Sequence, residues 1–211
     1  MNTTIANSLG EYFETLYLLN QNLITFCGTG GIVADHWTYQ KYIRNVITAI
    51  PQLIPYSKRG AKYVIVATDG LLEYSDEINF LEHDYCSILQ NHYEFLVNLK
   101  EVRNKFEHKM HSVFLSQTDG GSSILFGLHY LVKKQGEFKE TVLWANQFIA
   151  LAKDINSLFA KIQQLISEYA FKEGKDHYAY YQRLLRYDFT DFNKIYDSKL
   201  LQIIGKAFLP F

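Results

Sequence analysis

The residues best suited to chemistry in this chain lie in one short segment, Arg103-Asn104-Lys105-Phe106-Glu107-His108. A histidine moves protons near neutral pH, and an arginine holds a phosphate through two parallel hydrogen bonds. Together they suit cleavage of RNA by its own 2′-hydroxyl, in which a proton moves while charge builds on the phosphate. Chance gives Arg-Asn followed by histidine at this spacing only about 0.01 times in such a composition, so the segment supports a hypothesis.

The sequence around this segment predicts the helix that must position it. One apolar face of that helix is formed, at spacings of four, three, four and four residues, by Phe95, Leu99, Val102, Phe106 and Met110. At about 100° per residue, Arg103 lies about 60° from the centre of that face, at the edge of the core. Asn104, His108 and His111 share the opposite face. A single-domain core would leave that face in water, whereas a second subunit would cover it.

An ordinary surface helix gives another interpretation of the same residues. Arg103 and Glu107 are four residues apart and can form a solvent-exposed ion pair, worth a few tenths of a kcal/mol. His108 would then be a surface histidine. Such a pair would also weaken Arg103 as a phosphate ligand.

The segment Val102-Arg103-Asn104-Lys105-Phe106-Glu107-His108 resembles the Arg-x(4–6)-His signature of the HEPN superfamily, in which a polar residue usually follows the arginine. Members of that superfamily are helical-bundle proteins and are frequently dimeric. Many are metal-independent ribonucleases of bacterial toxin–antitoxin, abortive-infection and other defence systems. The resemblance covers the motif, the helix before it and the helical context, and does not extend to the C-terminal half of the chain.

The resemblance implies a role for each residue of the motif. His108 would be the general acid and base, Arg103 would bind the phosphate and stabilise the transition state, and Asn104 would orient the phosphate or His108. Two Arg–His pairs facing each other across a homodimer would complete the site. Positive potential and RNA contacts would come from Lys100, Lys105, Lys109 and His111. No cofactor is implied, and an antitoxin or other regulatory protein would be a further partner.

Two other functions stay open at this point. A non-catalytic HEPN-like module that binds nucleotide, RNA or a protein would keep the fold and the dimer but would not cleave RNA. An unrelated helical protein with an accidental motif would instead hold Arg103 and His108 apart and in bulk solvent.

Metal chemistry is not indicated by the remaining histidines. His83, Cys86 and His92 can supply three ligands, but their spacing fits no standard zinc pattern. His108 and His111 would need a third ligand that is not evident. We therefore expect no metal site.

Two further segments resemble binding motifs only in composition. Gly28-Thr29-Gly30-Gly31 lacks the lysine of a P-loop and the third glycine of a dinucleotide fingerprint, so it predicts a turn between helices. Aromatic and arginine residues recur near the C-terminus at Tyr180, Tyr181, Arg183, Arg186 and Tyr187. Such side chains can stack on nucleic acid, but this spacing is more typical of a helix core with extended guanidinium groups.

The elements around the motif predict an all-α fold, a helical bundle with a small inserted β-hairpin. We expect a single domain over residues 1–211. Its parts would be a motif-bearing bundle over about 1–111, a hairpin over about 112–127 and C-terminal helices over about 137–207. The long helix after Gly136 should end at Lys172-Glu173-Gly174. A break near Asn91 should divide the stretch from Asp76 to His111.

Composition limits where the protein works. A formal net charge of −1 excludes a globally basic surface, so any RNA site would be a local patch. The two cysteines, Cys27 and Cys86, form no disulfide framework and fit a reducing compartment. The N-terminus lacks the pattern of a signal peptide, and no apolar run approaches the ~20 residues of a membrane helix. We expect a cytoplasmic protein that does not bind membranes.

Overall fold

The structure is a computed structural model that describes part of the chain. The backbone is described for residues 3–29, 36–54, 76–108, 113–119, 124–134, 137–173 and 185–198. Within these segments, side chains are described for residues 9–25, 41–54, 81–104, 142–168 and 185–198.

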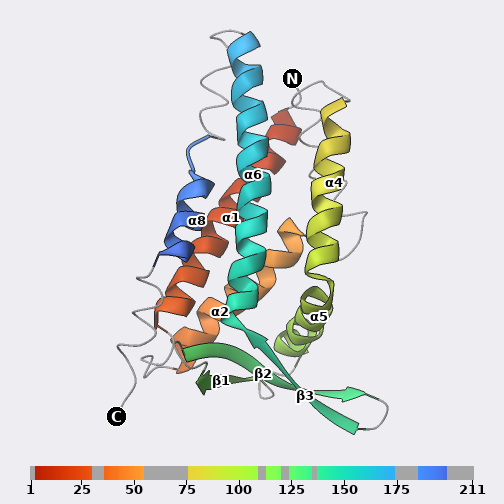
Figure 1. Ribbon diagram of the computed structural model, residues 1–211, viewed down its shortest axis with the longest axis vertical. Helices are drawn as coiled ribbons and strands as arrows, with labels where there is room; N and C mark the ends of the chain where they lie inside the picture. The colour runs from red at the N-terminus through yellow and green to blue at the C-terminus, as the bar shows by residue number, and fades with distance from the viewer. Residues whose placement is uncertain are drawn as a thin grey trace.

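The described residues form an all-α helical bundle that carries an inserted β-sheet, which confirms the predicted fold class (Figure 1). The helices are α1 (Thr3–Thr29), α2 (His36–Leu53), α4 (Asp76–Asn91), α5 (Tyr93–His108), α6 (Ala145–Glu173) and α8 (Phe189–Asp197). Helix α1 packs against α2, and α6 packs against α1, α4 and α8. Among the described helices, none combines the length and apolarity that crossing a bilayer requires.

The inserted sheet has three antiparallel strands in the order β1 (Val113–Asp119), β2 (Ile124–Lys134) and β3 (Glu137–Trp144). It lies at one end of the bundle, where it contacts α5 and α6 (Figure 1). Leu128 of β2 is in register with Leu115 of β1 and Leu143 of β3. The sheet therefore closes the end of the bundle at which α5 terminates.

The sheet is larger than the predicted hairpin. Residues 137–144 were predicted to begin the long helix, but they form β3 and pair with β2 from Gly127 to Lys134. One physical reason is the cap of α6: the backbone N–H of Trp144 donates to Oε1 of Gln147 at 2.9 Å. A glutamine that satisfies the N–H of the residue before the helix is half of a capping box, and it sets the helix start at Ala145.

Most helix limits agree with the sequence patterns. The break predicted near Asn91 lies at His92, and α6 ends at Glu173 as expected. Helix α1 runs to Thr29, so Gly28 and Thr29 of the glycine-rich segment, for which a turn was predicted, are helical. Helix α2 continues two residues past Pro51. Residues 62–72, whose structure the sequence left ambiguous, lie outside the described residues.

The C-terminal helices predicted over about 137–207 are described only in part. Within the described residues the chain forms α8 at Phe189–Asp197, and residues 174–184 and 199–211 lie outside the described part. Asp188 caps α8 by accepting hydrogen bonds from the backbone N–H groups of Thr190 and Asp191. The Thr190 hydroxyl, which also donates to this carboxylate, is the main cause that holds the pKa of Asp188 below its ordinary value.

The core lies along α1 and α6, where the buried residues recur at helical spacing. In α1 the buried residues are Leu9, Phe13, Leu16, Leu19 and Leu23. In α6 they include Phe148, Leu151, Ile155, Leu158 and Ile162. Phe13 packs edge to face against Phe159 and Phe189, with ring centroids 5.6 and 5.8 Å apart. This aromatic contact fastens α8 to the two long helices.

A network of buried amide groups crosses this core. Asn20 of α1 and Asn156 of α6 are fully buried and donate to each other's side-chain oxygens at 2.7 and 2.9 Å. Asn156 also donates to Asn193 of α8, and the Tyr196 hydroxyl donates to Asn20. These amides satisfy one another, so the network fixes how three helices pack instead of leaving a polar group available for a ligand.

We expect Asn156→Ala to lower the free energy of unfolding by about 2 to 3 kcal/mol, because it leaves the Asn20 amide buried with lost partners. Urea denaturation measures the loss. The matched control is Asn45→Ala, which removes an exposed amide–amide hydrogen bond to Asn22 and should cost less than about 0.5 kcal/mol. Equal losses in the two variants would contradict the structural role of the buried network.

Candidate functional site

The Arg103–His108 motif occupies the C-terminal part of α5. This helix runs without interruption from Tyr93 to His108, and its buried face includes Phe95, Leu99 and Val102, as the apolar stripe predicted. Arg103 is the residue after Val102, and its side chain is half-buried. Its position at the edge of the core agrees with the helical-wheel prediction.

Asn104 is exposed, on the face of α5 opposite the buried stripe. His108 is the last residue of α5, and its position four residues after Asn104 places it on the same side, about 6 Å further along the axis. Side-chain positions are not described for Lys105 or His108, whose backbones are helical. Lys109 and His111 lie outside the described residues. Lys100 is exposed one turn before Asn104, so the described part of this face combines a cation with an amide.

The exposed face of α5 also carries two apolar side chains. Tyr93 is 69% exposed and Val97 is 38% exposed. Together with Lys100 and Asn104 they follow spacings of four, three and four residues, which is one helix face. The apolar end and the polar end of this face therefore lie on the same side of α5, the side that the sequence analysis assigned to a second subunit.

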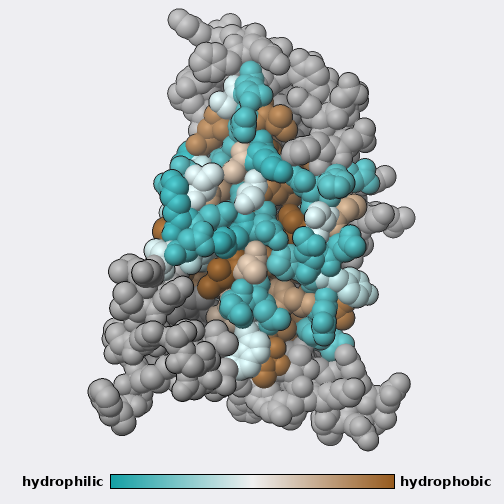
Figure 2. Space-filling view, viewed as in Figure 1, coloured by the Kyte–Doolittle hydropathy of each residue, from teal (hydrophilic) through white to brown (hydrophobic). Residues whose placement is uncertain are grey.

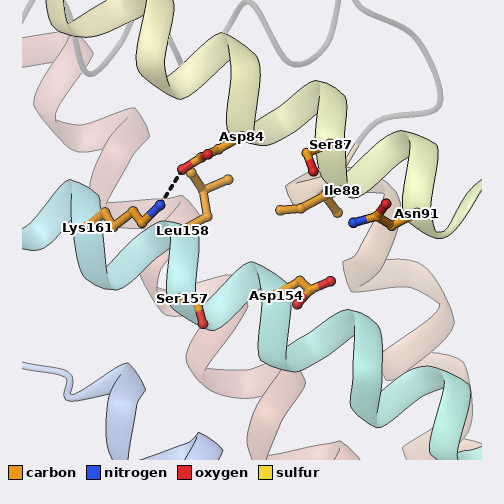
Figure 3. A pocket seen from close by; sticks show the side chains of 8 residues that line it. All are labelled: Asp84, Ser87, Ile88, Asn91, Asp154, Ser157, Leu158 and Lys161. Carbon is orange, nitrogen blue, oxygen red and sulfur yellow. Dashed lines mark hydrogen bonds and ion pairs between the residues drawn. The ribbon is translucent and has the colours of Figure 1, made fainter.

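A groove that the sequence did not predict lies between α4 and α6 (Figure 3). Its volume is about 160 Å³, and its lining consists of Asp84, Ser87, Ile88, Asn91, Asp154, Ser157, Leu158 and Lys161. Lys161 and Asp84 form an ion pair of 2.7 Å across it. The two helices are far apart in the sequence, so no local spacing indicates this groove. Polar side chains cover most of the described surface on this face of the molecule (Figure 2).

One further polar contact joins the region of the groove to the start of α5. His92, the residue between α4 and α5, lies with its Nε2 2.7 Å from Oδ2 of Asp154 on α6. The His92 side chain is only 13% exposed. The sequence indicated His92 only as a possible metal ligand, and no local spacing indicated Asp154, because it lies 62 residues away.

The three residues considered as metal ligands do not come together. The His83 side chain is 83% exposed and lies 3.8 Å from Asp84, whereas His92 is paired with Asp154. In the described part of the chain, no group of three or more His, Cys, Asp or Glu side chains is arranged to hold a metal ion. The alternative pair, His108 and His111, falls outside the described side chains.

Tyr85 of α4 is a buried titratable residue that takes no part in the polar contacts described above. Its hydroxyl has no hydrogen-bond partner among the described residues. Burial is the main cause that raises the pKa of Tyr85 far above its ordinary value, and the nearby Tyr12 raises it further. Tyr85 therefore stays neutral and belongs to the core.

Part of the second aromatic set is used in packing. Tyr187 stacks on Tyr17 of α1 with ring centroids 4.5 Å apart, and the Arg186 guanidinium lies 4.4 Å from the Tyr187 ring. The packing of Tyr187 agrees with a role in the core, but Arg186 and Tyr187 lie in the segment before α8 and not in a helix. Tyr180, Tyr181 and Arg183 lie outside the described residues.

Comparison of the chain with family models, with curated proteins and with solved structures finds no match in any of the three. The case for a function therefore rests on the residues of the chain itself and on where the fold places them.

Proposed function

We propose that the protein is a metal-independent endoribonuclease of the kind that the HEPN-like motif implies. The observation that carries this proposal is the position of the motif: Arg103 and Asn104 lie on one uninterrupted helix with His108, and Asn104 is exposed. A helical bundle is the context that the resemblance implies, and the motif lies near the end of α5, one of the bundle's helices. In this proposal His108 moves protons, Arg103 binds the scissile phosphate, and Asn104 orients the phosphate or His108.

The reaction needs no metal in this scheme, because the nucleophile belongs to the substrate. The 2′-hydroxyl of RNA attacks the adjacent phosphorus while His108 removes its proton, and a second proton transfer releases the 5′-hydroxyl of the leaving strand. The bidentate guanidinium of Arg103 stabilises the charge that builds on the phosphate oxygens. A defence or toxin role, restrained by an antitoxin or other regulatory protein, belongs to the same proposal.

The test is an assay of the purified protein on several single-stranded RNAs in the presence of EDTA. We expect cleavage with a maximum near pH 6.5, the ordinary pKa of histidine, and no cleavage of DNA, which lacks the 2′-hydroxyl. If no RNA is cut but RNA or a nucleotide binds, the non-catalytic module becomes the better description. Activity that EDTA removes would also contradict the proposal.

We further propose that the site is completed in a symmetric homodimer, with the exposed face of α5 in or beside the interface. The exposed Tyr93 and Val97 support this assignment, because burying them against a second copy is favourable. Light scattering at tens of micromolar should show a dimer, and Val97→Asp should shift it toward monomer. A strict monomer in the wild type would contradict a site shared between two subunits. Ile195→Asp, at an exposed position on α8, is the matched control.

A further inference from the structure

Helices α4 and α5 form one helical path that changes direction at His92. The backbone N–H of His92 donates to the carbonyl of Ile88 at 3.1 Å, which continues α4. The backbone N–H of Leu96 donates to the carbonyl of His92 at 2.9 Å, which begins α5. Figure 1 shows that α5 leaves the axis of α4 at this point. His92 is therefore the pivot from which the motif helix extends.

Two contacts with α6 restrain the direction in which α5 leaves this pivot, and α5 also contacts α2, β1 and β3. The first is polar: Nε2 of His92 lies 2.7 Å from Oδ2 of Asp154. The second is aromatic: the Phe95 ring meets the Phe148 ring edge to face, with centroids 4.9 Å apart and an interplanar angle of 88°. A short hydrogen bond between an imidazole and a carboxylate is directional, so it restrains the pivot more tightly than apolar packing alone.

The length of α5 amplifies any change at the pivot. Arg103 lies eleven residues after His92, which corresponds to about 16 Å along a helix. A rotation of about 10° at the pivot would displace Arg103 by roughly 3 Å over that length. Misplacement of a catalytic group by about 1 Å can reduce a rate roughly 100-fold, so the orientation of α5 matters for any chemistry at the motif.

We propose that His92 and Asp154 are positioning residues that set the orientation of the motif helix through the hydrogen bond between them. This inference rests on the proposed function, since it concerns the placement of Arg103 and His108. Neither residue touches the RNA in this scheme. The nearby Asp84–Lys161 ion pair also joins α4 to α6, with the same 2.7 Å separation, but it lies away from the pivot.

Substitutions at Asp154 separate positioning from general stability. Asp154→Ala removes the acceptor, and Asp154→Ser leaves a hydroxyl on a side chain one atom shorter, so each should lower the cleavage rate about tenfold or more. Asp154→Asn keeps an oxygen that can accept from the imidazole N–H, so it should retain the rate within about threefold. Lys161→Ala, which breaks the other α4–α6 ion pair, is the matched control and should leave the rate unchanged. Equal losses in the Asn and Ala variants, or a loss in the control, would overturn the proposal.

A distance measurement tests the same idea without RNA. Spin labels are attached at Asn104→Cys on α5 and Gln164→Cys on α6, two exposed positions, after Cys27→Ser and Cys86→Ser. We expect Asp154→Ala to shift or broaden the distance distribution by roughly 3 Å, and Asp154→Asn to leave it as in the parent. An unchanged distribution in Asp154→Ala overturns the positioning role, even in an active ribonuclease. A shifted distribution, together with unlabelled wild-type protein that cuts no RNA, removes the proposed function and keeps His92 and Asp154 as the pivot of α5.

Discussion

His108→Ala and Arg103→Ala should each lower the rate of RNA cleavage by about 10²- to 10⁴-fold. The first removes the group that moves protons, and the second removes the cation that stabilises charge on the phosphate. Arg103→Lys should recover little of the lost rate, because an ammonium group cannot reproduce the planar, bidentate contact. Initial rates on a labelled single-stranded RNA, measured in EDTA, give the size of each effect.

The control for these substitutions is His83→Ala. His83 is a highly exposed histidine on α4. Its substitution removes a histidine side chain outside the motif and should leave the rate unchanged. Circular dichroism should show wild-type helical content in all variants, because neither Arg103 nor His108 belongs to the apolar stripe of α5. Cleavage that persists undiminished in both motif variants would identify the activity as a contaminant.

The second large effect concerns the junction between α5 and α6. Phe148→Ala should lower the free energy of unfolding by about 3 to 5 kcal/mol, because it empties a fully buried site. The cavity also removes the edge-to-face contact with Phe95, through which the first turn of α5 packs on α6. Urea denaturation measures the change.

Two further variants calibrate that result. Phe148→Leu keeps most of the buried volume and should lose much less stability than the alanine variant. Ile195→Ala removes a side chain that is 40% exposed, and it should change the stability by less than about 0.5 kcal/mol. A loss below about 1 kcal/mol for Phe148→Ala would show that the ring does not fill the junction as described.

The helices could be predicted because their signal is local. Apolar residues such as Leu9, Leu16 and Leu23 recur at helical spacing, and each lies buried in α1. The strand β3 could not be distinguished from the start of the helix that follows it, because a strand is defined by its pairing with another segment, here β2, and not by its own residues alone. The short spacer of Gln135 and Gly136 between two strand-like runs was the available signal, and it predicts a hairpin turn.

The placement of two motif residues could be predicted because it depends on a local signal. The half-buried position of Arg103 and the exposure of Asn104 follow from the period of a single helix. The pairing of His92 with Asp154 could not be predicted, because the two residues meet through the packing of α6 on the end of α4. The structure describes only the backbone of Lys105 and His108, and Lys109 and His111 lie outside the described residues. The roles assigned from the sequence to all the motif residues stay predictions.

The chemical nature of the new ends tests the central claim most directly. Wild-type protein is incubated with single-stranded RNA in EDTA, and the fragments are identified by mass spectrometry, beside a His108→Ala preparation purified in the same way. Attack by the 2′-hydroxyl predicts 2′,3′-cyclic phosphate or 3′-phosphate ends paired with 5′-hydroxyl ends, absent from the His108→Ala reaction. Fragments with 5′-phosphate ends, or the same fragments from both preparations, would contradict a ribonuclease that works through Arg103 and His108.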